Sequence, residues 1–442
     1  MRRFLTVYFV LIVISASVAS IKPRSRPLEV SSPNGAIKVS FTLKNGQAFY
    51  QVRFQNKVLI NDSRLGFSLK DLPALDRFKV VSSDKSSFDE TWTQPWGEVK
   101  TIRNHYNNLF IALEEESTLK RRLNVEFRIY DDGLGFRYEI PNQPNLHEFI
   151  ITDEHTEFAL TENFSAWWIP AYGPEMDSEY LYKNTKLSEI KEKISTPATF
   201  ESGEKLFVSI HEAALIDYAG MALERNGDLK LKCDLIAWAN GDRVVASAPM
   251  RTPWRTIQLA TRPGDLITSY LILNLNEPNK LTDVSWIKPG KYNGMWWGMH
   301  VGVNTWEGGP SHGATTENVK RHIDFAAAHN LSAVLAEGWN EGWEGDWTVS
   351  GNFNFTKPYP DFNLEEISAY AKAKNIGLIA HHETGGNVKN YENQLEDAFR
   401  LCQQHGIHRL KTGYVNKLPS GERHQGQYMV RHYHKVMEMA AK

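Results

Sequence analysis

The chain of 442 residues contains only two cysteines, Cys233 and Cys402, so a disulfide framework is excluded. Neither belongs to a His/Cys cluster with the spacing of a zinc site, and both are expected to be small buried side chains. The sequence has no repeat of fixed period and no low-complexity tract. Positive charge is not in excess, with 50 Lys and Arg against 52 Asp and Glu, so the composition offers nothing obvious to nucleic acid.

Long apolar runs are also scarce. The clearest one, residues 4–16, follows Met1-Arg2-Arg3 and precedes the small residues 17–20. It is shorter than the roughly 20 residues that a membrane span needs. This pattern predicts a secretory signal peptide over residues 1–20, with a membrane anchor as the alternative. No other stretch is apolar enough to cross a bilayer, so we expect no membrane span after signal cleavage.

Helical periodicity is nearly missing from residues 21 to about 285. Residues 37–43 alternate polar and apolar side chains, a turn follows at Lys44-Asn45-Gly46, and residues 49–54 alternate again. Residues 124–130 show the same alternation. The segment is long for one sandwich domain, so residues 21–285 are predicted to form an antiparallel β super-sandwich of two stacked sheets with extra strands.

The pattern changes at the junction around Pro289-Gly290, after which apolar runs alternate with amphipathic segments. Four strands are predicted at residues 293–300, 333–337, 376–381 and 407–411, and four helices at residues 315–329, 363–374, 388–405 and 425–441. A β/α barrel needs eight strands in about 250 residues. Residues 286–442 are therefore expected to be the first four βα units of an incomplete (β/α)8 TIM barrel, in a chain truncated at its C-terminus. A four-stranded open α/β sheet is the structural alternative.

Polar residues follow the predicted strands where each strand ends. Glu337 ends the second strand, His381 ends the third with Glu383 two residues later, and Lys411 closes the fourth. Carboxyl ends of parallel strands converge on one mouth, which predicts a functional site there. From composition alone, Glu383 is equally well explained as a catalytic carboxylate or as the start of the next helix. The 13 Trp residues suit either a large core or a sugar-stacking surface, and their positions beside Gly, Asn and Glu favour the surface.

Several motifs in one order resemble glycoside hydrolase family 97. In the second half these motifs are residues 296–300, 337–343, 355–362, 381–384 and 411–414, and in the first half residues 132–139, 209–215 and 253–255. The resemblance implies a super-sandwich followed by a barrel, and calcium-dependent hydrolysis of α-glycosides in the periplasm. The protein is therefore expected to be secreted or periplasmic and to take an α-linked oligosaccharide.

The resemblance also implies roles for individual residues. Glu383 matches the family's general base, and Glu337, His381 and Lys411 match residues that contact the sugar. Glu139 matches the position from which the sandwich reaches a calcium ion, although one carboxylate cannot hold calcium alone. The other calcium carboxylates and the general acid are expected on strands that follow the fourth.

Gly413 occupies the place where retaining members of the family carry an aspartate nucleophile. A glycine cannot attack an anomeric carbon, so the sequence resembles the inverting branch, which acts on α-glucosides of the starch and malto-oligosaccharide type. Inversion needs an acid and a base carboxyl roughly 6.5–9.5 Å apart. Two alternatives stay open: a retaining α-galactosidase of the same family, and a catalytically inactive carbohydrate-binding remnant. If this chain is active, Glu341 is the next candidate for the missing acid.

Overall fold

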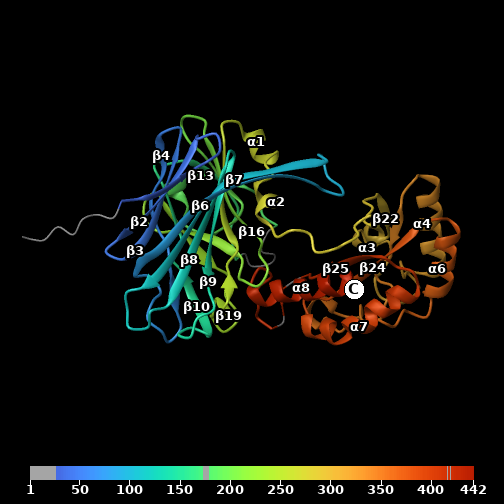
Figure 1. Ribbon diagram of the computed structural model, residues 1–442. Coiled ribbons are helices and arrows are strands. Elements are labelled where there is room, and N and C mark those ends of the chain that lie inside the picture. Colours follow the sequence, from blue (N-terminus) through green and yellow to red (C-terminus); the bar gives the residue numbers. More distant parts are fainter. Residues whose placement is uncertain (1–25, 173–178, 416, 419) are drawn as a thin grey trace, which may run out of the picture.

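A computed structural model of the chain describes residues 26–172, 179–415, 417–418 and 420–442. It contains a β-sandwich body and an α/β body, joined by an extended segment (Figure 1). The predicted signal peptide, residues 1–20, lies outside the described residues. Among the described residues, no helix combines the length and apolar character needed to cross a bilayer.

Two large antiparallel sheets form the first body, as the alternating sequence predicts. One has the order β1 (Leu28–Ser31), β2 (Ile37–Lys44), β3 (Gln47–Phe54), β4 (Lys57–Arg64), β11 (Glu157–Leu160), β18 (Lys230–Leu235), β17 (Met221–Arg225) and β14 (Ile194–Ser195). The other has the order β13 (Lys183–Lys186), β12 (Ser165–Trp168), β15 (Ala198–Glu201), β16 (Phe207–Ala213), β21 (Trp254–Ala260), β9 (Gly133–Ile140), β8 (Arg122–Tyr130), β7 (Thr101–Glu115) and β6 (Phe78–Thr93), with β20 (Met250–Arg251) beside β9. A small sheet of β19 (Val244–Ser247), β10 (Glu148–Glu154) and β5 (Phe67–Leu69) completes the body.

Aromatic side chains from both large sheets fill the space between them. Tyr50 of β3 packs against Phe136 of β9 with ring centroids 4.8 Å apart, and Phe127 of β8 belongs to the same buried cluster. Because successive side chains of a strand face opposite ways, only every second residue reaches this core. The observed burial of β2, where Ile37, Val39 and Phe41 are the buried positions, follows that rule.

The hairpin of β6 and β7 extends from the sandwich toward the α/β body (Figure 1). β6 is the edge strand of its sheet, and nearly all of its residues after Phe78 are exposed. Trp96 lies in the turn of this hairpin and is also exposed. β6 is therefore held mainly by backbone pairing with β7, and little of its own side-chain surface is buried.

The α/β body is built on four parallel strands in chain order: β22 (Tyr292–Gly294), β23 (Ala333–Leu335), β24 (Gly377–Glu383) and β25 (Arg409–Gly413). The main helices are α4 (Thr316–Ala328), α6 (Leu364–Ala373), α7 (Val388–Gln404) and α8 (Gln427–Ala441). The four predicted βα units are therefore present. Their continuation into a closed eight-stranded barrel stays a prediction, as do the domain limits 21–285 and 286–442.

The first strand was predicted wrongly at residues 293–300. It ends at Gly294, and a short helix, α3 (Trp296–His300), follows it. The Val301 N–H donates to the Trp297 carbonyl in this turn, and the Gly298 N–H donates to the Met295 carbonyl. The apolar run Met-Trp-Trp has the composition of a strand, but its backbone hydrogen bonds are local.

Gln427 at the start of α8 fastens the α/β body to the sandwich. Its side chain is fully buried, and its Oε1 accepts from Trp238 Nε1 at 3.1 Å and from the Val245 N–H at 2.8 Å. Its Nε2 donates to Asp217 Oδ1 at 2.9 Å and to the Val245 carbonyl at 3.0 Å. Arg431, one turn later, pairs with Asp217 at 2.6 Å. One end of α8 is thus bound to loops of the other body.

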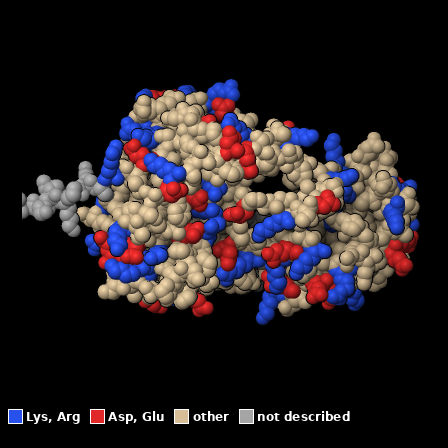
Figure 2. Space-filling model, viewed as in Figure 1, with Lys and Arg blue, Asp and Glu red and all other residues tan. Residues whose placement is uncertain are grey.

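Four short helices complete the described elements: η1 (Leu187–Glu189), α1 (Pro263–Ile267), α2 (Leu271–Leu275) and α5 (Trp347–Ser350). Figure 2 shows acidic and basic side chains interspersed over the visible face of both bodies, with no extended patch of one sign on that face. Charge thus gives no sign of a polyanion-binding surface there, in keeping with the near-neutral composition.

Candidate active site

The carboxyl ends of β23, β24 and β25 bring the predicted residues together. The strand register pairs His381 with Lys411 and Glu383 with Gly413. Because alternate residues share a face, these four positions lie on one face of the sheet. Glu337 lies two residues beyond the end of β23, and Lys411 Nζ is 2.6 Å from its Oε1. The structure thus brings these four predicted residues together, and their catalytic and binding roles stay predictions.

Glu383 is buried, with 4% of its surface exposed, and its two carboxylate oxygens differ in their surroundings. Oε1 accepts three backbone N–H bonds, from Thr384 at 3.0 Å, Gly385 at 2.9 Å and Val415 at 3.1 Å. Burial raises the pKa of the Glu383 carboxyl, and the three N–H groups and the Lys411 charge oppose that rise. The arrangement fixes one oxygen and leaves the other, Oε2, without a hydrogen bond from the described residues, as a general base requires.

Gly413 leaves open the space that Oε2 of Glu383 uses. A Cβ placed on Gly413 would lie 1.8 Å from that oxygen, far inside van der Waals contact. No side chain can therefore occupy position 413 while Glu383 keeps this conformation. A side chain at position 413 and the present conformation of Glu383 are therefore mutually exclusive.

His381 is a neutral imidazole at the same face. Burial, together with the nearby charge of Lys411, holds the pKa of His381 well below its ordinary range. Its ring stacks on Trp343, with centroids 5.9 Å apart and planes at 22°. Its Nδ1 is buried and has no hydrogen-bond partner among the described residues. A sugar hydroxyl is a suitable partner for such an atom because it can both donate and accept.

Glu337 and Lys411 form an ion pair that is partly exposed to solvent. Glu337 is almost fully buried, whereas nearly half of the Lys411 side chain reaches solvent. A buried carboxylate beside an ammonium group can accept from one sugar hydroxyl while the lysine donates to another. Glu341, by contrast, is partly exposed and pairs with Lys357 at 2.7 Å.

The backbone donors around Glu383 were missed by sequence reasoning. Thr384 and Gly385 directly follow the carboxylate, and Val415 lies beyond the next strand. The residue type does not show where a backbone N–H will point in the fold. The one available signal was the Gly385-Gly386 pair, since both glycines adopt positive φ values of 53° and 73° in the turn that aims these N–H groups.

Glu139 belongs to β9 of the sandwich. It faces a groove of about 1190 Å³ lined by sandwich residues and by Arg431 of α8, and neither Glu337 nor Glu383 lines that groove. Its Oε2 accepts from Arg251 Nε at 2.9 Å, so a cation already neutralises it. No group of three or more His, Cys, Asp or Glu suited to a metal occurs among the described residues. Glu139 alone cannot hold a calcium ion, and its predicted calcium role stays untested.

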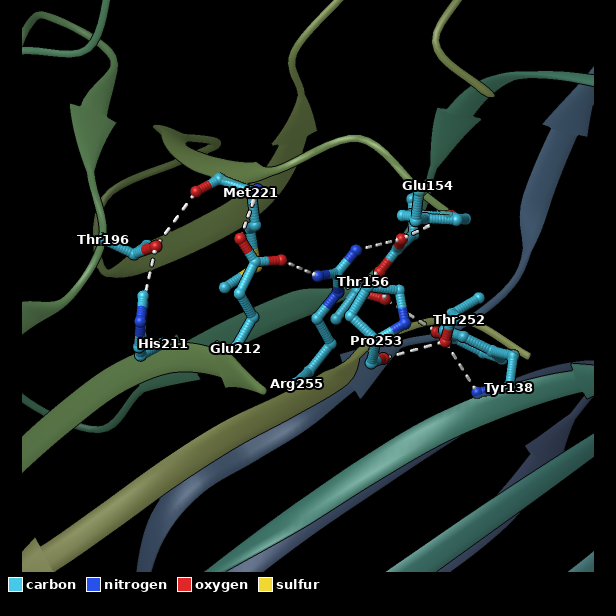
Figure 3. A network of polar contacts seen from close by, with 11 residues as sticks. Tyr138, Glu154, Thr156, Thr196, His211, Glu212, Met221, Thr252, Pro253 and Arg255 are labelled. Atoms are coloured by element: carbon cyan, nitrogen blue, oxygen red, sulfur yellow. Dashed lines mark hydrogen bonds and ion pairs between the residues drawn. The ribbon is translucent and has the colours of Figure 1, made fainter. Parts of the chain in front are cut away.

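Two of the recognisable sandwich motifs meet in a buried ion network (Figure 3). Arg255, fully buried, is 2.6 Å from Glu154 Oε2 and 2.7 Å from Glu212 Oε2. Tyr218 donates to Glu154 at 2.9 Å, and Glu212 accepts from the Met221 N–H at 3.0 Å. Arg255 and Glu154 are fully buried, and all residues of this network belong to the first body.

Comparison with known proteins assigns the family. Residues 30–278 match the model of the glycosyl-hydrolase 97 N-terminal domain, and residues 296–442 match that of glycoside hydrolase 97. The chain belongs to glycoside hydrolase family 97. As a member of that family it is similar to a retaining alpha-galactosidase of Bacteroides thetaiotaomicron, with 24% identity over 93% of this chain and 62% of the relative. A probable retaining alpha-galactosidase of Streptomyces bingchenggensis is also 24% identical, over 67% of this chain and 42% of the relative.

Solved structures agree with this assignment. A family 97 enzyme from Pseudoalteromonas sp., in complex with acarbose, has a TM-score of 0.90 and 42% identity, covering 94% of this chain and 64% of its own. A variant of that enzyme in complex with panose gives the same values. A beta-arabinopyranosidase has a TM-score of 0.75 at 18% identity, covering 94% of this chain and 65% of its own, which is a likeness of fold alone. The family 97 chain described here thus spans less than two thirds of these relatives.

Proposed function

We propose that this protein is an inverting glycoside hydrolase acting on α-glucosides of the starch and malto-oligosaccharide type. The observation that carries the proposal is the relation between Gly413 and Glu383. Glycine supplies no nucleophile at the end of β25, and Glu383 Oε2 fills the space that a nucleophilic side chain there would need. Because no second carboxylate fits at position 413 beside Glu383, Glu383 is suited to act as the base that activates water.

In this mechanism Glu383 takes a proton from a water molecule that attacks the anomeric carbon opposite the departing α-linked group. The oxygen of that group takes its proton from the general acid expected on a later strand. The N–H groups on Oε1 keep the carboxylate oriented, and its raised pKa makes it a stronger base than an exposed glutamate. Glu337, Lys411 and His381 bind hydroxyls of the sugar ring and fix its position. The product of the first turnover is the β-anomer.

The glucoside preference draws on the similar solved structures. The Pseudoalteromonas enzyme, at 42% identity, binds acarbose and panose. The second candidate, a retaining α-galactosidase, is favoured by the curated relatives at 24% identity. Gly413 argues against retention, because a retaining mechanism needs a nucleophilic carboxylate about 5–5.5 Å from the acid.

α-Glucosyl fluoride gives the sharpest test, since departing fluoride needs little help from an acid and the reaction reports on the base. Proton NMR of the first-formed product distinguishes the mechanisms. We expect β-glucose first, and loss of at least about 10²-fold in rate for Glu383→Gln. α-Glucose first, or a covalent glycosyl-enzyme seen by mass spectrometry, would refute inversion. Faster turnover of α-galactosyl fluoride would favour the second candidate, and sugar binding without turnover of either fluoride would mean an inactive carbohydrate-binding protein.

Calcium and location are further parts of the proposal that rest on the resemblance. For calcium, the direct test is the melting temperature of the protein with calcium chloride and with EDTA. An equal melting temperature would count against a bound ion. For location, N-terminal sequencing of the protein from the extracellular and periplasmic fractions tests cleavage after residue 20.

A further inference from the structure

Tyr414, directly after Gly413, is tied to α8 by a partly buried chain of hydrogen bonds. Its hydroxyl lies 2.9 Å from His432 Nε2, and His432 Nδ1 lies 2.8 Å from Glu392 Oε1 of α7. Lys435 pairs with the second oxygen of Glu392 at 2.6 Å. The chain therefore joins the end of β25 to the two helices that follow β24 and β25.

The direction of these hydrogen bonds follows from their chemistry. A carboxylate only accepts, so the proton of the neutral imidazole lies on Nδ1, facing Glu392. His432 Nε2 is then an acceptor, and the Tyr414 hydroxyl donates to it. Burial lowers the pKa of His432, although Glu392 opposes that shift, so the neutral form is favoured. Every polar atom of the chain has a matched partner, which makes it rigid.

This chain holds the backbone that supplies the third donor to Glu383. Val415, the next residue, gives its N–H to Glu383 Oε1 at 3.1 Å. On the other side of Tyr414, the Gly413 carbonyl accepts from the Thr384 N–H at 3.0 Å and from its hydroxyl at 2.8 Å. The Tyr414 side chain is thus a separate anchor for this three-residue segment, outside the sheet.

The helix that carries His432 is itself fixed at its first residue. Gln427 is buried in loops of the sandwich, with bonds to Asp217, Trp238 and Val245. His432 lies five residues further along the same helix. A continuous path of bonded groups therefore runs from the sandwich through α8 to the segment beside Glu383.

We propose that Tyr414 and His432 are positioning residues of the active site, which hold the Val415 N–H against Glu383. They thereby couple the orientation of the Glu383 carboxylate to the docking of α8 on the sandwich. The proposal rests on the proposed role of Glu383 as the base. Neither residue needs to touch the sugar. Their effect is on the carboxylate and on the rate at which it activates water.

Loss of the Tyr414 hydroxyl should raise the pKa of the Glu383 carboxyl. The Val415 N–H favours the ionised carboxylate, so weakening this bond raises the pKa of Glu383. The other charged or titratable groups that act on this carboxylate and on Tyr414 are Lys411, Glu392 and Tyr433, and they stay in place. The acid limb of the pH–rate profile should then move to higher pH.

The test compares Tyr414→Phe and His432→Leu with Tyr433→Phe as the matched control. Tyr433 is a partly buried neighbour on α8 whose ring packs against Tyr414 with centroids 5.2 Å apart. With α-glucosyl fluoride, both test variants should lose about tenfold in kcat with little change in KM, and the acid limb of kcat/KM should move to higher pH. The control should keep the wild-type profile. Equal pH profiles for Tyr414→Phe and Tyr433→Phe would overturn the proposal.

A second readout does not depend on turnover. Carbon-13 NMR of protein labelled at glutamate carboxyls follows the ionisation of Glu383 directly, with the signal assigned by its absence in Glu383→Gln. We expect the Glu383 titration to move to higher pH in Tyr414→Phe and not in Tyr433→Phe. An unmoved titration overturns the positioning role even if the protein hydrolyses α-glucosides. A moved titration in a protein that hydrolyses no fluoride supports the positioning role and refutes the proposed function alone.

Discussion

Replacing Gly413 by alanine is the most direct perturbation of the site. The new Cβ would lie 1.8 Å from Glu383 Oε2, where ordinary contact begins near 3.4 Å, so the carboxylate has to withdraw by about 1.6 Å, the difference of the two distances. The φ of Gly413 lies outside the left-handed region, so alanine meets crowding and not backbone strain. Withdrawal over such a distance breaks the bonds of 2.9–3.1 Å that hold Oε1.

We expect Gly413→Ala to lower kcat/KM on α-glucosyl fluoride by about 10²-fold or more, because a misplacement of about 1 Å already costs that much. Overpacking should also lower the free energy of unfolding by about 1–3 kcal/mol. The assays are initial rates by fluoride release and urea-induced unfolding. Gly264→Ala in α1 is the matched control, since a Cβ there meets open space and no positive φ. A Gly413→Ala protein with wild-type rates would refute the reasoning about mutual exclusion.

Three further predictions concern single side chains. Arg255→Met leaves Glu154 buried without its cation, and should cost about 3–5 kcal/mol of unfolding free energy in a urea titration. Lys411→Met removes a charged hydrogen bond from Glu337 and from the sugar, and should raise KM about 10- to 100-fold in steady-state kinetics. Burial raises the folded-state pKa of Glu383, so the unfolded chain ionises first and stability falls as pH rises between the two pKa values. Glu383→Gln removes this pH-dependent loss of stability. The variant should therefore melt at a higher temperature than wild type at pH 7 but not at pH 4.

For each of these three predictions, a contrary result would have a specific meaning. An Arg255→Met protein as stable as wild type would mean that the buried carboxylates are satisfied in another way. An unchanged KM with a lowered kcat in Lys411→Met would move that residue from binding to chemistry. A melting temperature of Glu383→Gln below wild type at pH 7 would mean that the three N–H bonds outweigh the cost of burying the charge.

Local patterns in the sequence were enough for the strands of the sandwich and for the four long helices. The alternation at residues 37–43 became β2, Ile37–Lys44, and that at residues 124–130 became β8, Arg122–Tyr130. Helix α4 falls within the helix predicted at residues 315–329, and its N-cap is Thr315, whose hydroxyl accepts from the Asn318 N–H at 3.2 Å. These features depend on neighbours within a few residues, which the sequence displays directly.

Features set by distant parts of the chain could not be read in this way. The strand ends predicted a cluster around Glu383, but the register that pairs Glu383 with Gly413 is a property of two strands about thirty residues apart. The Val415 N–H that reaches Glu383 has no side-chain signature. The ion pair of Glu139 with Arg251 is equally hidden, and a carboxylate that looks free in the sequence is already paired in the fold.

The long edge strand β6 has a consequence for how this protein behaves at high concentration. An unpaired strand edge offers its N–H and C=O groups to any other extended chain, and a strand of 16 residues offers many of them. The middle of β6 reads Ser82-Ser83-Asp84-Lys85-Ser86-Ser87, which is polar and carries both signs of charge. Such a sequence has little tendency to form the dry side-chain interfaces of stacked sheets. The polar middle of β6 therefore disfavours association of the folded molecule with other sheets along this part of the edge.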